Sequence, residues 1–419
     1  MKKFLKSLLS LSLAFALIFT LASCGGGSTG DETKKSDGKA EPAKYHIGIV
    51  TGTQSQGEDE IRAAEAMVAK YGNAEEGGMI KHLTYPDNFA QEQEQVISII
   101  AGLADDPDMK AIMVNQSIPG TAVAFQQIRD INPDIKLIAI EPQEEPQVID
   151  PVADVVIDND NYNRGYLMID AAKRMGAKAF VHISFPRHMS MEKMQVRKAV
   201  MEATCKDLGL KFYSETAPDP LSDVGMAGAK QFIQEQMPAW VEKYGKDTAF
   251  FCTNDAQTEP LLQKVAELGA IFVEADLPSP LMGYPGAFGI DLKAEAGDWD
   301  AILKKVEDVV IEKGGSGRMG TWAKSYGYST IDAATLLAIN SIEGKMDVKS
   351  EDDLLKCLRE VTDNTPWNYS VYVNRATGEK HENHFLLYED TYVFGKGFLG
   401  MTDVKIPEKY QKITGSEEK

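Results

Sequence analysis

Short apolar runs alternate with segments of helical periodicity from residue 45 to residue 157. The runs at 45–51, 79–85, 111–114, 137–140 and 154–157 are nearly continuous in apolar residues, which predicts strands that are covered on both faces. The segments 59–71, 90–103 and 120–129 between them carry apolar residues at helical spacing. This order predicts βαβ units and a parallel sheet.

The same order restarts at residue 162. Helices are expected at 162–174, 191–208, 226–244 and 260–268, and strands at 179–184, 211–215, 249–253 and 270–274. The predicted fold class is therefore α/β, with two doubly wound parallel-sheet lobes at 44–157 and 158–284.

The pattern is less regular after residue 284. Helices are expected at 301–312 and 329–342, and strand character appears at 369–373 and 384–388. We expect 285–345 to return to the first lobe, so that a hinge of several crossings joins the lobes beside a ligand cleft. The lobe that carries 346–419 is left open.

The N-terminus has the pattern of a targeting segment. Lys2 and Lys3 precede an apolar run at 8–22, which is shorter than the roughly 20 residues of a membrane span and suits the core of a signal peptide. The run ends in Leu21-Ala22-Ser23-Cys24, which resembles a bacterial lipobox. The resemblance implies removal of 1–23 and acylation of Cys24, for example with palmitate. An ordinary secretory signal with a chance cysteine is the alternative. Residues 24–43 are small and polar, as in a flexible tether.

Charge and motifs exclude several classes of function. The formal net charge is -19, from 44 basic and 63 acidic side chains, so nucleic acid is not an expected partner. The sequence contains no C-x-x-C pair, and residues 44–419 contain no G-x-S-x-G, H-E-x-x-H or Walker A motif. We therefore expect a protein that is not an enzyme, with no cofactor, no metal and no catalytic residue. We also expect a monomer.

Polar side chains follow the predicted strands at the edge where ligands bind in open α/β sheets. The amides and carboxylates there can form hydrogen bonds with hydroxyl groups. The aromatic rings can stack on a sugar or a base, and an arginine can bind a hydroxyl pair or a carboxylate. Because the acids would repel a polyanion, we expect a neutral sugar or nucleoside-like ligand. Each residue could instead form a turn or cap a helix. The candidates are Thr53, Gln54, Asn88, Asn115, Gln116 and Glu141 in the first lobe, and Phe185, Arg187, Asn254, Asp255 and Tyr284 later in the chain.

Three segments carry a resemblance to the type I periplasmic-binding-protein fold, over about 45–345. They are 45–50 with the polar loop that follows, 158–160 with Gly165, and 251–256. The chain is similar to the sugar-binding branch and, in length and anchoring, to the basic-membrane-protein, nucleoside-binding branch. The resemblance implies a lipoprotein on the extracytoplasmic face of a bacterial cell membrane, which closes on a small molecule and delivers it to an ABC permease. A membrane-tethered sensor for a signalling partner and a secreted α/β hydrolase are the alternatives.

Overall fold

The first lobe is built on a sheet of seven strands. The computed structural model describes residues 42–415, and the strands of this sheet run in the order β10-β11-β5-β4-β3-β1-β2. All neighbouring pairs are parallel except β10 with β11. The bounds are β1 His46–Thr51, β2 Ile80–Thr84, β3 Met109–Asn115, β4 Lys136–Ile140, β5 Val155–Asn159, β10 Trp367–Val373 and β11 Lys380–Glu389.

Helices cover both faces of this sheet, so its central strands β1, β3, β4 and β5 are buried along nearly their whole length. Ile47 and Ile49 pack into one core together with apolar residues of α1, α12 and α13, and Val50 packs on the opposite face with α2 and α3. The bounds are α1 Glu58–Tyr71, α2 Gln93–Ala101, α3 Thr121–Ile131, α4 Pro146–Ile149, α12 Tyr326–Ile342 and α13 Glu351–Val361, with short 3-10 turns at Ala74–Glu76 and Gly102–Asp105.

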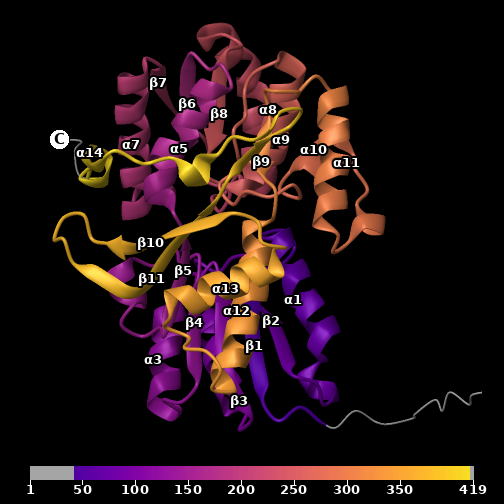
Figure 1. Ribbon diagram of the computed structural model, residues 1–419, viewed down its shortest axis with the longest axis vertical. Coiled ribbons are helices and arrows are strands. Elements are labelled where there is room, and N and C mark those ends of the chain that lie inside the picture. Colours follow the sequence, from indigo (N-terminus) through magenta and orange to yellow (C-terminus); the bar gives the residue numbers. More distant parts are fainter. Residues whose placement is uncertain (1–41, 416–419) are drawn as a thin grey trace, which may run out of the picture. The chain divides into compact units, whose positions relative to one another are not determined.

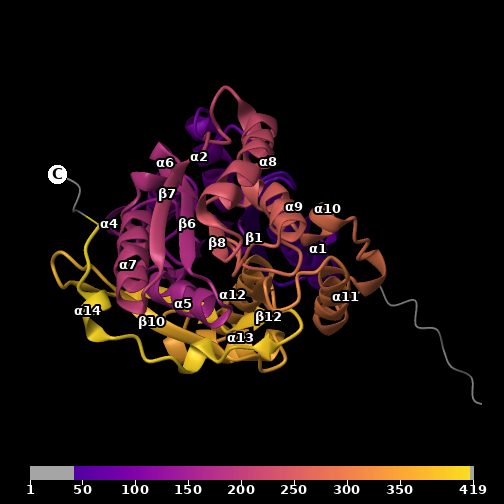
Figure 2. The same ribbon diagram turned by 90° about the horizontal axis from the view of Figure 1, so that it is seen from above.

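The second lobe repeats this layering around a smaller sheet in the order β7-β6-β8. Figure 2 shows α7 and α8 on opposite sides of β6 and β7. The strands are β6 Ala179–Ser184, β7 Lys211–Thr216 and β8 Thr248–Cys252. The helices are α5 Asn161–Arg174, α6 Pro186–Met189, α7 Glu192–Leu208, α8 Gly225–Tyr244, α9 Thr258–Leu268, α10 Tyr284–Phe288 and α11 Trp299–Glu312, with 3-10 turns at Asp255–Gln257 and Lys293–Glu295.

The strand predicted at 270–274 is present only as isolated bridges. Ile271 pairs with Ala249 of β8, and Phe272 pairs with Met319 next to β9. The chain then leaves the sheet, because the carbonyl groups of Ala275 and Asp276 accept hydrogen bonds from the Arg164 guanidinium instead of from a neighbouring strand. These bridges connect the β7-β6-β8 sheet to another three-stranded sheet in the order β13-β12-β9. Its strands are β9 Gly320–Trp322, β12 Thr391–Val393 and β13 Gly397–Phe398.

Within residues 42–415 the chain passes between the lobes three times, at 159–161, 323–325 and 389–391. The crossings are hydrogen-bonded to one another. The Asp160 amide donates to the carbonyl of Leu387 at 2.8 Å, and the amides of Ala323 and Lys324 donate to Glu389 at 3.0 and 3.3 Å. The structure therefore has the predicted architecture of two lobes joined by a hinge of several crossings (Figure 1). The predicted return of 285–345 to the first lobe needs correction, because α10 and α11 pack in the second-lobe core and the chain crosses only at 323–325.

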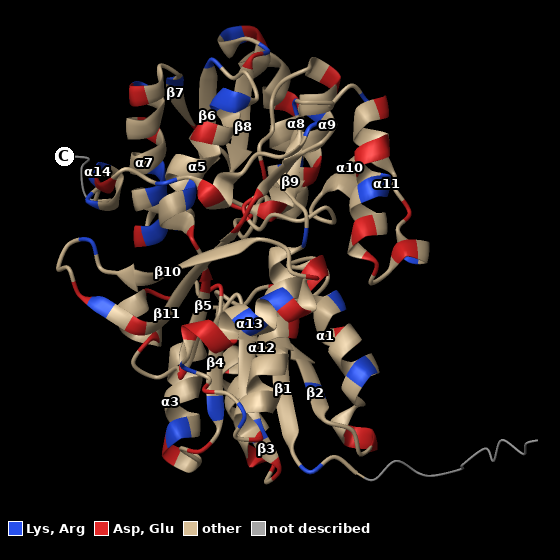
Figure 3. Cartoon of the chain, viewed as in Figure 1, with Lys and Arg blue, Asp and Glu red and all other residues tan. Residues whose placement is uncertain are grey.

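The structure also shows where the C-terminal segment lies. β10 and β11 extend the sheet of the first lobe, β12 and β13 pair beside β9, and α14 (Glu408–Gln411) packs near α5. A 3-10 turn at Met401–Asp403 lies between β13 and α14. Figure 3 shows acidic positions gathered in the central region where β5 and β11 run between the lobes.

Some sequence predictions fall outside the described residues. The signal peptide at 1–23, the acylation site at Cys24 and nearly all of the tether lie there. Within 42–415, no helix has both the length and the apolar character that a membrane crossing requires. Cys205, Cys252 and Cys357 are buried and unpaired in this part of the chain.

Candidate functional site

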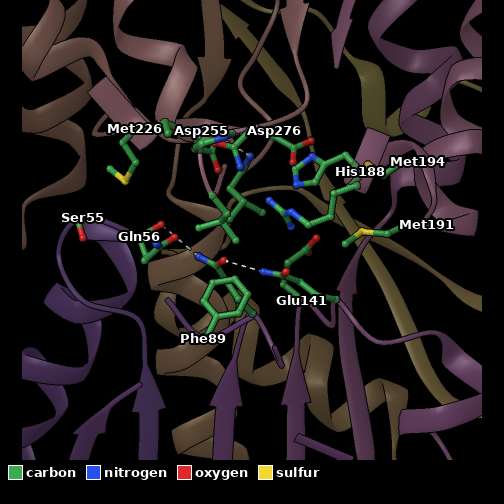
Figure 4. Close-up of a pocket in the computed structure, with 18 of the residues that line it drawn as sticks. Ser55, Gln56, Phe89, Glu141, His188, Met191, Met194, Met226, Asp255 and Asp276 are labelled. Atoms are coloured by element: carbon green, nitrogen blue, oxygen red, sulfur yellow. Dashed lines mark hydrogen bonds between the residues drawn. The ribbon is translucent and has the colours of Figure 1, made fainter. Parts of the chain in front are cut away.

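A small cavity lies between the two lobes at the carboxyl ends of their strands (Figure 4). Its volume is about 80 Å³, whereas a water molecule in the liquid takes about 30 Å³. The space between the lobes is therefore small. The lining residues are Ser55, Gln56, Phe89, Gln116, Glu141, Gln143, Arg187, His188, Met191, Lys193, Met194, Pro220, Leu221, Met226, Asn254, Asp255, Ala256, Asp276 and Leu277.

Two residues on the first-lobe wall have backbone angles that non-glycine residues seldom adopt. Gln116, directly after β3, has φ 54°, and Glu141, directly after β4, has φ 48°. This conformation costs roughly 1–2 kcal/mol per residue and is concentrated at binding sites. Hydrogen bonds hold the Gln116 amide in place, because its nitrogen donates to Glu60 Oε1 at 3.2 Å and its oxygen accepts from Gln143 at 3.3 Å.

Glu141 takes part in an ion-pair cluster that joins the lobes. Lys193, near the start of α7, donates to Glu141 Oε1 at 3.2 Å, to Asp158 Oδ1 at 3.1 Å and to the carbonyl of Pro142 at 2.8 Å. The other oxygen of Glu141 accepts from the Asn159 amide at 2.9 Å. One ammonium group of the second lobe thus bridges the first-lobe wall and the hinge.

The pKa values of the two carboxyl groups in this cluster move apart. Burial, together with the charge of Asp158, raises the pKa of Glu141 to about 8. Burial alone would also raise the pKa of Asp158, but the charges of Lys193 and His384 outweigh it and lower that pKa to about 2. Asp158 is therefore the ionised member of the pair. His384 Nδ1 lies 3.0 Å from Asp150, and His384 Nε2 lies 3.6 Å from Asp158.

The second-lobe wall comes from the turns after β6 and β8. Arg187 donates to both oxygens of Asp219, at 2.8 and 3.1 Å. His188 is 7% exposed, and burial lowers its pKa to about 4, so the imidazole is neutral near pH 7. The Asn254 oxygen accepts from the Ala256 amide at 3.1 Å, which leaves its amide nitrogen available to the cavity.

Two aspartates complete this wall. Asp276 forms an ion pair with the buried Arg197 at 2.6 Å. Asp255 accepts one hydrogen bond, from the Leu277 amide at 3.3 Å. Burial and the charge of Asp276 raise the pKa of Asp255 well above its ordinary value.

The structure brings together five of the predicted site residues: Gln116, Glu141, Arg187, Asn254 and Asp255. Two aromatic predictions need correction. Tyr284 is buried in the core of the second lobe, where its hydroxyl donates to the carbonyl of Gly320 at 2.7 Å. Phe185 is also buried, and its ring packs on His188 with centroids 4.2 Å apart.

The other predicted residues lie outside the cavity wall. Asn115 is buried at the end of β3, one residue before Gln116. Gln54 and Asn88 are exposed on loops next to Ser55 and Phe89, and the Thr53 hydroxyl donates to Asp87.

Several lining residues are not among the candidates that the sequence suggests. Asp276 follows the predicted strand 270–274, so the rule of strand carboxyl ends could have found it. Lys193 and the methionines Met191, Met194 and Met226 lie in or beside helices that begin at the cavity, and no strand-end pattern marks them.

A separate group of possible metal ligands lies at the amino end of the first-lobe sheet. Ligand atoms of His46, Asp106 and Asp108 lie within 4.8 Å of one another. His46 Nδ1 is already 2.7 Å from Asp106. The group is not part of the cavity wall.

Two solved structures are similar to this chain. The chain is 24% identical to a crystal structure of a proposed transcriptional regulator from Clostridium difficile 630, with a TM-score of 0.68 over 84% of this chain and 99% of that one. It is 13% identical to an ABC transporter periplasmic solute binding protein from Actinobacillus succinogenes 130z with bound D-allose, with a TM-score of 0.47 over 72% of this chain and 93% of that one.

Relatives and family models cover much of the sequence. An uncharacterized protein of Treponema pallidum (strain Nichols) is 43% identical over 202 residues, which are 48% of this chain and 90% of that protein. A second family model matches residues 332–413. Because a model described as "Protein of unknown function (DUF3798)" matches residues 45–320, the chain belongs to the DUF3798 family.

Proposed function

We propose that this protein is a lipid-anchored, extracytoplasmic solute-binding protein. It closes its two lobes on a small polar molecule and delivers that molecule to an ABC permease. The anchor rests on the lipobox-like sequence at Cys24 and on the polar tether that follows it.

The observation that carries this proposal is the cavity between the lobes. It collects polar groups from the carboxyl ends of strands in both lobes, as expected for a ligand site in open α/β sheets. Two of its first-lobe residues, Gln116 and Glu141, keep a costly backbone conformation that places their side chains at the cavity. At about 80 Å³ the cavity is far smaller than the roughly 300–1,000 Å³ of a typical ligand pocket, so we infer that a ligand enters when the hinge opens.

The lining chemistry supports a polar ligand that is not an anion. Amides of Gln56, Gln116 and Asn254 can donate to and accept from hydroxyl groups. The two lining cations, Arg187 and Lys193, are already paired with carboxylates and are not available to a phosphate. These features are compatible with the sugar or nucleoside-like class that the sequence predicted.

A hydrolase is less well supported. The hydroxyl groups bonded near His188 are Thr253 and Ser184, and both residues are buried outside the cavity lining. A substrate in the cavity would have no lining serine or threonine beside this histidine. A membrane-tethered sensor would use the same binding chemistry as a transport protein, and gene neighbourhood separates the two.

The test is ligand discovery on protein purified from cells without refolding. Native mass spectrometry should show one small molecule per chain. Thermal shifts with sugars, nucleosides, amino acids and sugar phosphates should then identify compounds that raise the melting temperature by mass action. If no molecule is retained and no compound raises the melting temperature, solute binding is contradicted.

A further inference from the structure

The charged groups on the cavity wall are matched in every case but one. Arg187 is held by Asp219, Lys193 by Glu141 and Asp158, and Asp276 by Arg197. Asp255 lines the cavity and forms an ion pair with none of the described residues. Figure 4 shows Asp255 and Asp276 on the second-lobe wall of the cavity, with Glu141 on the opposite wall.

The surroundings of Asp255 raise the free energy of its ionised form, and so they raise its pKa. The charges of Asp276 and, from the first lobe, of Glu60 both disfavour its ionised form. Arg164, whose charge favours the ionised form, is itself held by Glu274 at 2.9 Å and by two carbonyl groups. Asp255 is partly exposed at the cavity, and a cation bound beside it would favour its ionised form.

His188 offers a second polar group on the same wall of the cavity. Its ring is more than nine-tenths buried and lines the cavity on the side of Asp276 (Figure 4). Nδ1 lies 3.2 Å from the Thr253 hydroxyl, while Nε2 has no hydrogen-bond partner among residues 42–415. When the proton is on Nδ1, Nε2 is an acceptor that can take a hydrogen bond from an ammonium or guanidinium group.

We propose that the solute carries a positive charge, as a primary ammonium or a guanidinium, and that this charge is bound by the Asp255 carboxylate. The inference rests on the proposed solute-binding function and narrows its ligand class. It replaces the neutral ligand expected from the sequence with a cationic one that can still carry hydroxyl groups for the glutamine and asparagine amides.

The lining also restricts the kind of cation. Quaternary ammonium groups are typically held in cages of several aromatic rings, and Phe89 is the one aromatic side chain of the described wall apart from the His188 imidazole. An ammonium or guanidinium with N–H donors fits better, because Asp255 and His188 both offer acceptors. The methionines 191, 194 and 226, with Leu221 and Leu277, provide an apolar surface for the carbon skeleton.

The experiment begins with the molecule released from native protein. Its charge at pH 7 is read from its retention on a cation exchanger. In parallel, glucosamine, glucose and glucose 6-phosphate serve as probes that share one ring and differ in charge, together with putrescine and arginine as flexible cations. We expect the released molecule to be a cation, and we expect any stabilising probe to be an amine or a guanidine.

The matched variants are Asp255→Asn, which removes the cavity charge, and Asp223→Asn, which removes one exposed charge from the same lobe. Calorimetric titration with the released cation should show a loss of affinity of roughly ten- to a hundredfold in Asp255→Asn. Asp223→Asn should bind within about twofold of the wild type, since an exposed charge outside the cavity is screened.

Each outcome has a clear meaning. A neutral or anionic released molecule, or full affinity in Asp255→Asn, would overturn the cationic ligand and leave solute binding intact. A neutral molecule that needs Asp255 would mean that the protonated carboxyl donates a hydrogen bond, which also overturns it. Absence of any released or stabilising molecule would contradict the proposed function itself, and the cationic class with it.

Discussion

Lys193 is the side chain whose loss should change the molecule most. It belongs to the second lobe, but three of its acceptors belong to the first lobe or the hinge: Glu141, Pro142 and Asp158. Lys193→Met keeps a long apolar side chain of similar length and removes the ammonium group. The carboxylates then lose the one cation that lies between them.

The magnitude follows from the burial of the two carboxylates. Side chains of Glu141 and Asp158 are 10% and 3% exposed, and breaking a buried ion pair typically costs about 3–5 kcal/mol. The pKa of Glu141 is about 8, so this group holds a proton for much of the time at pH 7. Asp158 also keeps His384 at 3.6 Å. We therefore expect a loss of about 3 kcal/mol, at the lower end of the range.

The assay is equilibrium unfolding in urea at pH 7 and at pH 4.5, with Lys206→Met as a control on the exposed side of the same helix. Removing Lys193 raises the pKa of Asp158, so protonation should relieve the buried charge and the loss should shrink at pH 4.5. The control should stay within about 0.5 kcal/mol of wild type. Small-angle scattering should also show a larger radius of gyration in Lys193→Met, since a contact between the lobes is gone. Equal stability of Lys193→Met and wild type at pH 7 would refute the bridging role.

Four further predictions test separate parts of the account. Cys24→Ser should release the protein from the membrane fraction, and a variant that still sediments entirely with membranes would place the anchor elsewhere. Asn254→Ala and Asn254→Ser should both weaken ligand binding roughly ten- to a hundredfold in calorimetry, and Ser should preserve stability because it keeps an acceptor for the backbone amide of Ala256. Full affinity in both variants would exclude a contact between the ligand and the Asn254 side chain. Gln116→Asn should be at least as stable as wild type, because asparagine tolerates φ 54° better than glutamine. It should bind ligand more weakly, because its shorter side chain draws the amide group back from the cavity. Unchanged binding would show that the strained backbone at Gln116 does not serve ligand binding. Asp158 should contribute about 2 kcal/mol above pH 4, because its pKa falls from 3.8 to about 2 on folding, and this should be lost as the pH falls toward 2; an Asp158→Asn variant with the same acid profile as wild type would contradict it.

The repeated order of strands and helices could be predicted because each element carries its own apolar pattern. The eight strands expected before residue 260 are present as β1 to β8, within a few residues of the expected bounds. The helix α13 was omitted although its signal is local: Ser350 caps it by accepting from the Asp353 amide, and Leu354, Leu355 and Leu358 form its buried face.

The position of the C-terminal strands could not be predicted in the same way. Phe385 of β11 pairs with Ile157 of β5, and a pairing across so many residues depends on tertiary packing that no local pattern records. The predicted strand at 270–274 shows the same limit. Its apolar run is correct, but Arg164 from a distant helix binds the carbonyl groups that follow it.

The residues of the candidate site also divide into those that a local sequence pattern predicts and those that depend on tertiary packing. Gln116 and Glu141 follow strands directly, and the other three predicted lining residues lie close after a strand end. The strand-end rule therefore places all of them at the cavity: Gln116, Glu141, Arg187, Asn254 and Asp255. The rule cannot tell which way a side chain turns, and for this reason Tyr284 and Phe185 were expected at the site but are packed in the core. It also cannot find Lys193, whose role depends on two lobes meeting.

The most direct measurement of the central claim is a crystal structure of the protein purified from cells with its retained molecule. We predict ligand density between the lobes, in contact with Gln116 and Glu141 on one wall and with Asn254 and Asp255 on the other. Density for the retained molecule at any other place, with the space between the lobes filled by protein or by water alone, would contradict it.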